Sequence, residues 1–84
     1  MKKITVRYFA SIREAIGQGS EAVETSAATL GALRDELIAR GGAHASSLAR
    51  GRAVRMALNQ TLSDESATLA DGVEVAFFPP VTGG

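Results

Sequence analysis

The residues of this chain with the clearest chemical potential are the last eight, which read FFPPVTGG. Pro79 and Pro80 are the only two prolines of the 84 residues. Proline has no backbone N–H to donate to a sheet, so strand pairing should end at Phe78. Two successive prolines also hold the backbone extended, which should carry the chain away from the folded body. We therefore expect a folded domain at residues 1–78 and a projecting tail at residues 79–84.

The second half of this tail combines extended and slender residues. Val81 and Thr82 favour an extended backbone, and Gly83 and Gly84 have no side chains, so they can enter a passage too narrow for a Cβ atom. Six residues at about 3.3 Å each reach about 20 Å. The pattern predicts that the tail is inserted into another protein and that the carboxylate of Gly84 is the reactive group. A frayed chain end is the alternative explanation.

Two aromatic residues are predicted on the face of the sheet that the helices leave uncovered. If Ile4 and Val6 face the core, alternation places Phe9 on the opposite face, and Phe78 follows by the same rule from Phe77. Exposed neighbouring rings are typical of a docking surface, which Leu62 would extend. The alternative is a bulge that turns one ring inward.

The composition excludes several classes of protein and site. Nine basic and nine acidic residues cancel, which argues against nucleic acid and anionic membranes as partners. No apolar run approaches the roughly 20 residues of a membrane span, and the start MKKITVRYF does not resemble a signal peptide. Cysteine is absent, so thiolate metal sites, disulfides and a cysteine nucleophile are excluded. We expect a cytoplasmic protein without a metal site.

The chain also lacks the means to activate its own terminus. No P-loop or Gly-x-Gly-x-x-Gly motif is present, so the chain cannot bind ATP by those means. Activation of the terminal carboxylate would therefore have to come from a partner. His44 is the only histidine, and we expect it in an exposed loop without an acidic companion.

The elements that must position these residues follow from hydrophobic periodicity. A first strand over Ile4–Phe9 is followed by a short helix that a Ser11–Glu14 capping box begins and Gly17 ends. A weak second strand is predicted at 21–25. Thr29 should cap the main helix at 30–40, with an apolar stripe that Gly41 and Gly42 terminate; the stripe consists of Leu30, Leu33, Leu37 and Ile38.

The second half of the chain returns to strands. Residues 43–52 are expected to be irregular or a single helical turn, and residues 53–59 alternate as a strand. Asn59 and Gln60 predict a turn, residues 61–63 a short strand, and residues 73–78 the last strand. This order predicts an α+β domain of the β-grasp type, in which the first and last strands are parallel neighbours and one main helix covers one face of a mixed sheet.

The quoted tail, together with YFASIRE near the start and LNQTLS in the middle, resembles the MoaD family of ubiquitin-like sulfur carriers, the small subunits of molybdopterin synthase. The resemblance extends over essentially the whole chain and is weakest at 41–52. It implies that an E1-like enzyme uses Mg-ATP to adenylate Gly84 and that a persulfide protein supplies sulfur to form a thiocarboxylate. This chain itself would bind no cofactor.

The resemblance further implies a large catalytic subunit that accepts the tail and converts cyclic pyranopterin monophosphate to molybdopterin in a two-plus-two complex. The small subunit would then be a sulfur donor without catalytic groups of its own. Phe9, Arg13, Leu62 and Phe78 match family positions at the shared docking surface. Three alternatives stay open: a carrier for thiazole or another thio-metabolite, a ubiquitin-like protein modifier, and an interaction module with an idle tail.

Overall fold

The computed structural model describes residues 1–80, which contain five strands and three helices. In chain order they are β1 (Lys2–Tyr8), α1 (Ala10–Ile16), β2 (Ser20–Thr25), α2 (Leu30–Ile38), α3 (Gly42–Leu48), β3 (Arg55–Leu58), β4 (Thr61–Ser63) and β5 (Glu74–Phe78). The predicted α+β class is confirmed, and every predicted strand is present.

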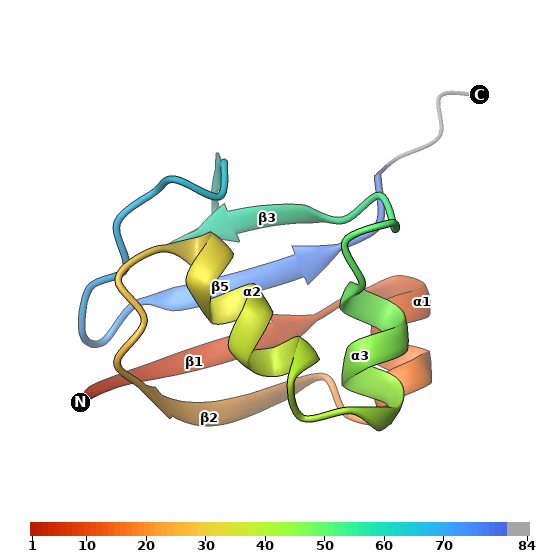
Figure 1. Cartoon of the computed structure of the whole chain (residues 1–84). Coiled ribbons are helices and arrows are strands. Elements are labelled where there is room, and N and C mark those ends of the chain that lie inside the picture. The colour runs from red at the N-terminus through yellow and green to blue at the C-terminus, as the bar shows by residue number, and fades with distance from the viewer. Residues whose placement is uncertain (81–84) are drawn as a thin grey trace.

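The strands form one mixed sheet in the order β2-β1-β5-β3-β4. The first and last strands, β1 and β5, are central and parallel, and all other pairs are antiparallel (Figure 1). In that pair Val6 lies opposite Val75 and Tyr8 opposite Phe77. This is the predicted β-grasp arrangement, and it brings the carboxyl ends of β1 and β5 to the same edge of the sheet.

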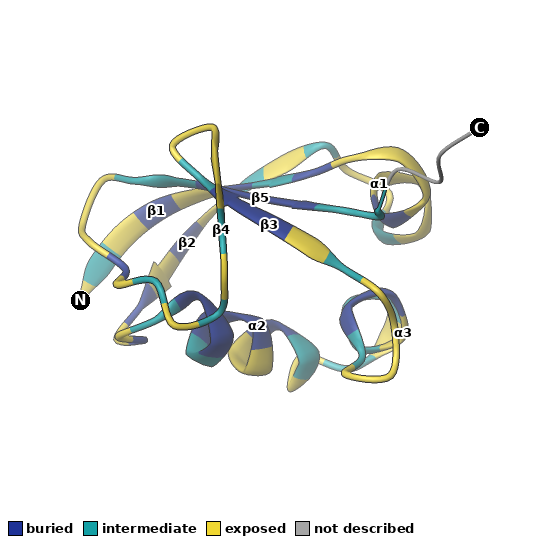
Figure 2. Cartoon of the chain, turned by 90° about the horizontal axis from the view of Figure 1, so that it is seen from above, coloured by how far each residue is buried: buried dark blue, intermediate teal, exposed yellow. Residues whose placement is uncertain are grey.

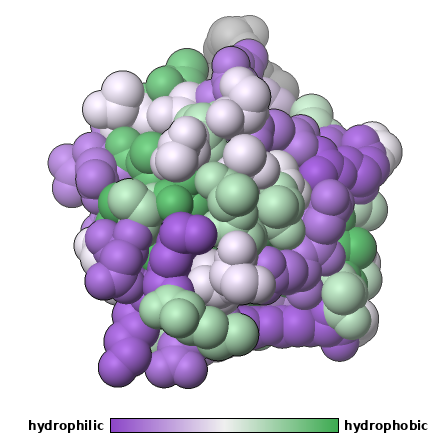
Figure 3. Space-filling view, turned by 60° about the vertical axis from the view of Figure 1, so that its left-hand side comes forward, coloured by the Kyte–Doolittle hydropathy of each residue, from purple (hydrophilic) through white to green (hydrophobic). Residues whose placement is uncertain are grey.

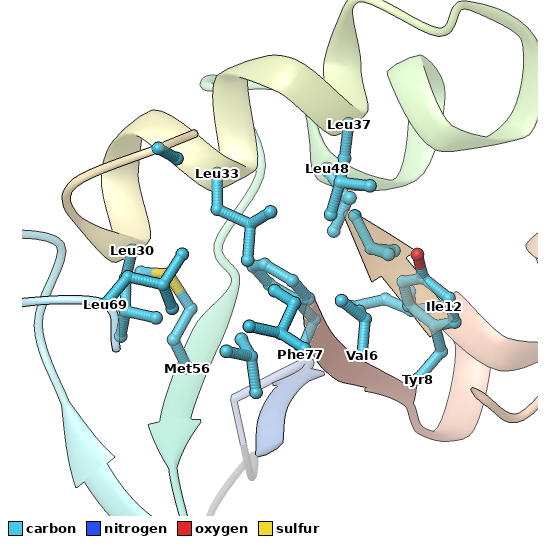
Figure 4. Packing of buried hydrophobic residues seen from close by; sticks show 14 residues of the cluster. Val6, Tyr8, Ile12, Leu30, Leu33, Leu37, Leu48, Met56, Leu69 and Phe77 are labelled. Atoms are coloured by element: carbon cyan, nitrogen blue, oxygen red, sulfur yellow. The ribbon is translucent and has the colours of Figure 1, made fainter. Parts of the chain in front are cut away.

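The core lies between the sheet and helices α2 and α3, which cover the same face (Figure 2). Alternation along β1 and β5 sends every second residue into this layer, where the side chains of Val6, Val75 and Phe77 are fully buried. Leu30, Leu33 and Leu37 meet them from α2 (Figure 4). The predicted apolar stripe of the main helix therefore contacts the predicted inner face of the sheet, with Ile38 only partly buried.

Helix α2 begins as the sequence predicts and ends two residues earlier. The side-chain oxygen of Thr29 accepts a hydrogen bond from the backbone N–H of Ala32 at 3.2 Å. The helix ends at Ile38 instead of Arg40, because the chain must turn before α3, and Gly41 takes the left-handed value φ 77°.

The start of α1 corrects one prediction. The helix begins at Ala10, and Phe9, which makes no side-chain capping bond, occupies the N-cap position expected for Ser11. The backbone carbonyl of Phe9 accepts the N–H groups of Ile12 and Arg13, so no capping box is needed. The predicted stop is confirmed, since Gly17 has φ 88°.

A second correction concerns residues 42–48, which form the seven-residue helix α3 in a segment predicted to be irregular or a single helical turn. Leu48 is fully buried in the core. The buried guanidinium of Arg34 in α2 donates to the carbonyls of Leu48 and Ala49, both at 2.8 Å, and so satisfies the end of α3. This contact between residues 14 and 15 positions apart has no signature in local periodicity.

The turn between β3 and β4 is confirmed. Asn59 and Gln60 both have positive φ, 49° and 68°, as in a two-residue hairpin turn. This turn rises on the side of the sheet opposite the helices (Figure 2). Among the described residues, no helix is long and apolar enough to cross a membrane.

Candidate docking site at the base of the tail

A groove of about 700 Å³ lies on the uncovered face of the sheet, along β5. We call it the aromatic groove. Its lining includes Arg7, Phe9, Glu74, Ala76, Phe78 and Pro79. Gln60 and Pro80 close its two ends, so the groove extends from the β3–β4 turn to the base of the tail.

The strand register explains why these residues meet. Arg7 lies opposite Ala76 in the parallel pair, and both point away from the core because their neighbours Val6 and Val75 point into it. The side chain of Ala76 is small, so it leaves space at the bottom of the groove. The structure therefore brings Phe9 and Phe78 into one site, as predicted, and neither ring is turned inward by a bulge.

Phe9 presents the more exposed of the two rings. Its side chain is 38% exposed, whereas Phe78 is half-buried. The guanidinium of Arg7 lies 5.1 Å from the ring centroid of Phe9, a cation–π arrangement. A carboxylate oxygen of Glu74 is 4.0 Å from the same guanidinium. Arg7 thus holds one wall of the groove in place.

The backbone beside Phe9 is strained. Ala10 has φ 52°, in the left-handed region that residues with a Cβ adopt at a cost of roughly 1–3 kcal/mol. The turn at Ala10 takes the chain directly from β1 into α1 and leaves Phe9 at the rim. Sequence reasoning missed this residue, for which no local signal exists. Arg7, Glu74 and Ala76 were also missed, although strand alternation places them on the face of Phe9 and Phe78.

The other two predicted docking residues lie outside the aromatic groove. Leu62 is 62% exposed on β4 and lines a separate hollow beside β3. It lies opposite Ala57, which lies opposite Ala76, so Leu62 belongs to the same face of the sheet. Arg13 is exposed on α1, with its Nε near Gly19.

Strand pairing ends at Phe78, as the proline that follows it predicts. Pro79 and Pro80 are half-buried and line the aromatic groove. The predictions for Val81, Thr82, Gly83 and Gly84 lie outside the described residues. For the same reason the proposed boundary between domain and tail stays a prediction.

The prediction for His44 is wrong. His44 lies in α3 with a side chain only 17% exposed, and its Nε2 is 3.0 Å from Oε2 of Glu21. Its ring also makes an edge contact with Tyr8, with centroids 5.8 Å apart. Tyr8 donates a hydrogen bond to Glu21 at 2.6 Å, and Arg40 donates another at 2.7 Å. We call these four residues the Glu21 cluster.

Electrostatics in the Glu21 cluster favour a charged carboxylate. Burial by itself would raise the pKa of Glu21, but the hydrogen bonds from Tyr8, Arg40 and His44 outweigh burial and lower this pKa to about 2. Burial raises the pKa of Tyr8 well above its usual range, and the bond to Glu21 adds to this effect. The cluster joins β1, β2 and the α2–α3 region, and we assign it a structural role. No group of three or more metal-ligating side chains occurs within residues 1–80.

A β-grasp domain with an aromatic groove at the exit of a C-terminal tail defines a class of small carrier and modifier proteins, and the comparisons agree. The sequence model of the ThiS family matches residues 6–84. The chain belongs to the ThiS family.

Individual relatives support the narrower resemblance to MoaD-type small subunits. The chain is 43% identical to the molybdopterin synthase sulfur carrier subunit of Escherichia coli and 41% identical to that of Haemophilus influenzae, in each case over 96% of this chain and 99% of the relative. The resemblance found in the sequence is thereby confirmed.

Solved structures confirm the fold. The chain resembles one chain in the solved complex of subunits 1 and 2 of molybdopterin-converting factor from Helicobacter pylori. The TM-score is 0.68 and the identity 28%, over 98% of this chain and 99% of the other. It also resembles SAMP1 from Haloferax volcanii, with TM-score 0.76, 26% identity and the same coverage.

Proposed function

We propose that this chain is the sulfur carrier subunit of a molybdopterin synthase and that it acts in the cytoplasm. The observation that carries the proposal is the aromatic groove, which adjoins Pro79 and Pro80 where the Gly-Gly tail begins. The two features that sulfur delivery needs, a docking surface and a tail, are thus adjacent in the chain. The sulfur carrier names of relatives at 41–43% identity support the same conclusion.

The chemistry belongs to the carboxylate of Gly84. A carboxylate is a poor acyl donor, because its oxygen is a poor leaving group. An E1-like partner with Mg-ATP converts it to an acyl-adenylate with release of pyrophosphate. The terminal sulfur of a protein persulfide then displaces AMP to give an acyl disulfide, and a thiol cleaves its S–S bond by forming a disulfide with the sulfur-donating cysteine. The product is a thiocarboxylate at the end of the tail. We expect groups of the folded domain to take no part in bond making, since six fully extended tail residues would reach about 20 Å from it.

Delivery requires docking on the large catalytic subunit. The rings of Phe9 and Phe78 are desolvated against the partner, and aromatic anchors of this kind commonly dominate binding energy. Docking at the groove aims the tail into the partner's active site, where the thiocarboxylate transfers sulfur to the pyranopterin. Both partners in such a complex therefore contribute, one with the sulfur and the other with the catalytic groups.

The test is mass spectrometry of the intact protein from its native cells, combined with removal of Gly84. We expect a fraction of the free chain to carry the mass increase of one oxygen replaced by sulfur. Deleting Gly84 should abolish both this species and molybdopterin formation in a reconstituted assay with the large subunit. Undiminished molybdopterin formation by the deletion variant would mean that the tail is idle.

A protein modifier is the second candidate, because SAMP1, named as a small archaeal modifier protein, shares the fold at 26% identity. The same experiment separates the two functions. Ladders of chain linked through Gly84 to lysines of other proteins would favour the modifier, whereas the sulfur-bearing free chain favours the carrier.

A further inference from the structure

Ala10 has a backbone conformation that its side chain does not favour. It is the first residue of α1, and its φ of 52° lies in the left-handed region. Among the described residues that have a side chain, only Asn59 and Gln60 also have positive φ, and those two form the β3–β4 hairpin turn, which requires it. Ala10 belongs to no such turn, so the surrounding fold must impose its conformation.

The fold fixes the backbone on both sides of Ala10. The N–H of Phe9 donates to the carbonyl of Phe77 at 3.2 Å, which holds the end of β1 against β5. The carbonyl of Phe9 accepts the N–H groups of Ile12 at 3.2 Å and Arg13 at 3.3 Å, which holds the same residue against α1. Ile12 is buried in the core. The chain must therefore pass from an extended strand into a packed helix within one residue.

The hydrogen bonds by themselves restrain Phe9 only loosely. All three exceed the usual N–O distance of about 2.9–3.0 Å. The side chain at position 10 adds a second restraint, because a residue with a Cβ atom has a small left-handed region, at φ of roughly +50 to +70°, whereas glycine moves over a broad range of positive φ. Once the fold imposes positive φ, Ala10 permits less movement of Phe9 than glycine would.

The restrained segment carries the most exposed ring of the docking site. Ala10 is itself exposed and lines the aromatic groove next to Phe9. The guanidinium of Arg7, 5.1 Å from the ring centroid, restrains the Phe9 ring, while Ala10 restrains the backbone that carries it. A ring that is already held in place loses less conformational entropy when a partner binds it, and this raises affinity.

We propose that Ala10 is a positioning residue for docking, which keeps the Phe9 ring in the orientation that the partner binds. Glycine would adopt the same φ without strain, so the domain should be more stable with glycine at this position and should bind its partner more weakly. This inference rests on the proposed function, in which the partner is the large subunit of molybdopterin synthase. Stability and affinity should therefore change in opposite directions, whereas a residue that only supports the fold would change both in the same direction.

The test compares Ala10→Gly with the wild type in the full-length chain. We expect the thermal midpoint of the variant to rise by about 2–6 °C, because the backbone strain is released. Calorimetric titration with the large subunit from the same organism should show affinity about tenfold weaker. The NMR order parameter of the Phe9 N–H should be lower in the variant, which reports the backbone motion directly.

Ala28→Gly is the matched control, because it makes the same change at an exposed residue whose φ is not positive. Ala28 lies in the segment between β2 and α2, at the end of the molecule away from the tail base (Figure 1). The surface on that side shows apolar areas separated by hydrophilic side chains (Figure 3). The control should lower the midpoint by about 2–6 °C, because glycine adds entropy to the unfolded chain and releases no strain, and should leave affinity unchanged.

The possible results separate this inference from the proposed function. Affinity of Ala10→Gly equal to that of the wild type, or a fall in both its midpoint and its affinity, would overturn the positioning role and leave the proposed function standing. Weaker binding with an unchanged order parameter at Phe9 would mean that the methyl group itself contacts the partner, so Ala10 would not be a positioning residue. A wild-type chain that fails to bind the large subunit would overturn both proposals.

Discussion

Phe77 and Phe78 are adjacent in the chain and have opposite environments. The Phe77 ring is fully buried and stacks on Tyr8, with ring centroids 6.3 Å apart. The Phe78 ring is half-buried and lines the aromatic groove. Strand alternation alone accounts for the difference. The pair therefore offers a matched comparison of a residue that stabilises the fold with one that is available to a partner.

We expect Phe77→Ala to lower the free energy of unfolding by about 3–5 kcal/mol, because it leaves a cavity in a close-packed core. Phe78→Ala should lower it by about 1 kcal/mol and should instead weaken binding to the large subunit by about 2 kcal/mol or more. Urea unfolding measures the first quantity and calorimetric titration the second. If Phe78→Ala destabilised the fold as strongly as Phe77→Ala, its ring would belong to the core and the docking role would be wrong.

Among the elements, α3 contacts the rest of the fold both through Leu48, which is buried in the core, and through the polar Glu21 cluster. Glu21 lies opposite Val6 in the β1–β2 pair, on the core face of an edge strand, where its carboxylate receives His44 from α3 and Arg40 from the segment before α3. A charged group in this position is stabilised only because three donors surround it. The Glu21 cluster thus fixes where α3 packs, and α1 packs next to α3.

The lowered pKa of Glu21 predicts a pH dependence. Its pKa is about 2 in the folded protein and 4.5 as the ordinary value, so its contribution to stability is complete above pH 4.5 and is lost as pH falls towards 2. Glu21→Gln should reduce stability at pH 7 by about 1–2 kcal/mol, less than the full shift implies because solvent screens the cluster. The variant should also lose less stability than the wild type between pH 4.5 and 2.

Urea unfolding at a series of pH values measures this effect. Glu24→Gln is the control, because Glu24 is exposed on the same strand and accepts no side-chain hydrogen bond within residues 1–80. A wild-type pH profile that matches that of Glu21→Gln would show that the cluster contributes nothing through its charge.

For the molecule as a whole, folding and transfer are separable. The core consists of residues between Ile4 and Phe77, and the tail begins after the last strand has ended. Substitutions in the tail should therefore leave the fold intact while they change delivery. Under the proposed function, this division would let the domain fold independently of the group that the tail carries.

Gly83→Val tests this division. We expect the thermal midpoint to stay within about 1–2 °C of the wild type, because the core of the described residues ends at Phe77. Such a change lies within the range of ordinary surface substitutions. Molybdopterin formation should fall by at least about a hundredfold, since a β-branched side chain blocks a narrow passage and a misplacement of about 1 Å can cost that much. Full activity of this variant would show that the passage is not narrow.

Much of the fold and half of the site follow from local sequence. Alternation along residues 4–8 and 73–78 predicts both central strands, their inner faces and the outward orientation of Phe9 and Phe78. The Thr29 cap and the leucine stripe predict α2. The proline pair predicts where pairing ends. These features depend on residues close together in the chain, so a window of ten residues contains the whole cause.

Tertiary structure alone decided the rest. The tertiary fold places His44 within hydrogen-bond distance of Glu21, 23 positions away in the chain. It also places the guanidinium of Arg34 against the carbonyl of Leu48 at the end of α3, a segment without clear periodicity. Ion pairs and buried hydrogen bonds form between groups that the topology brings within about 3 Å, and no local pattern records which distant residues those are.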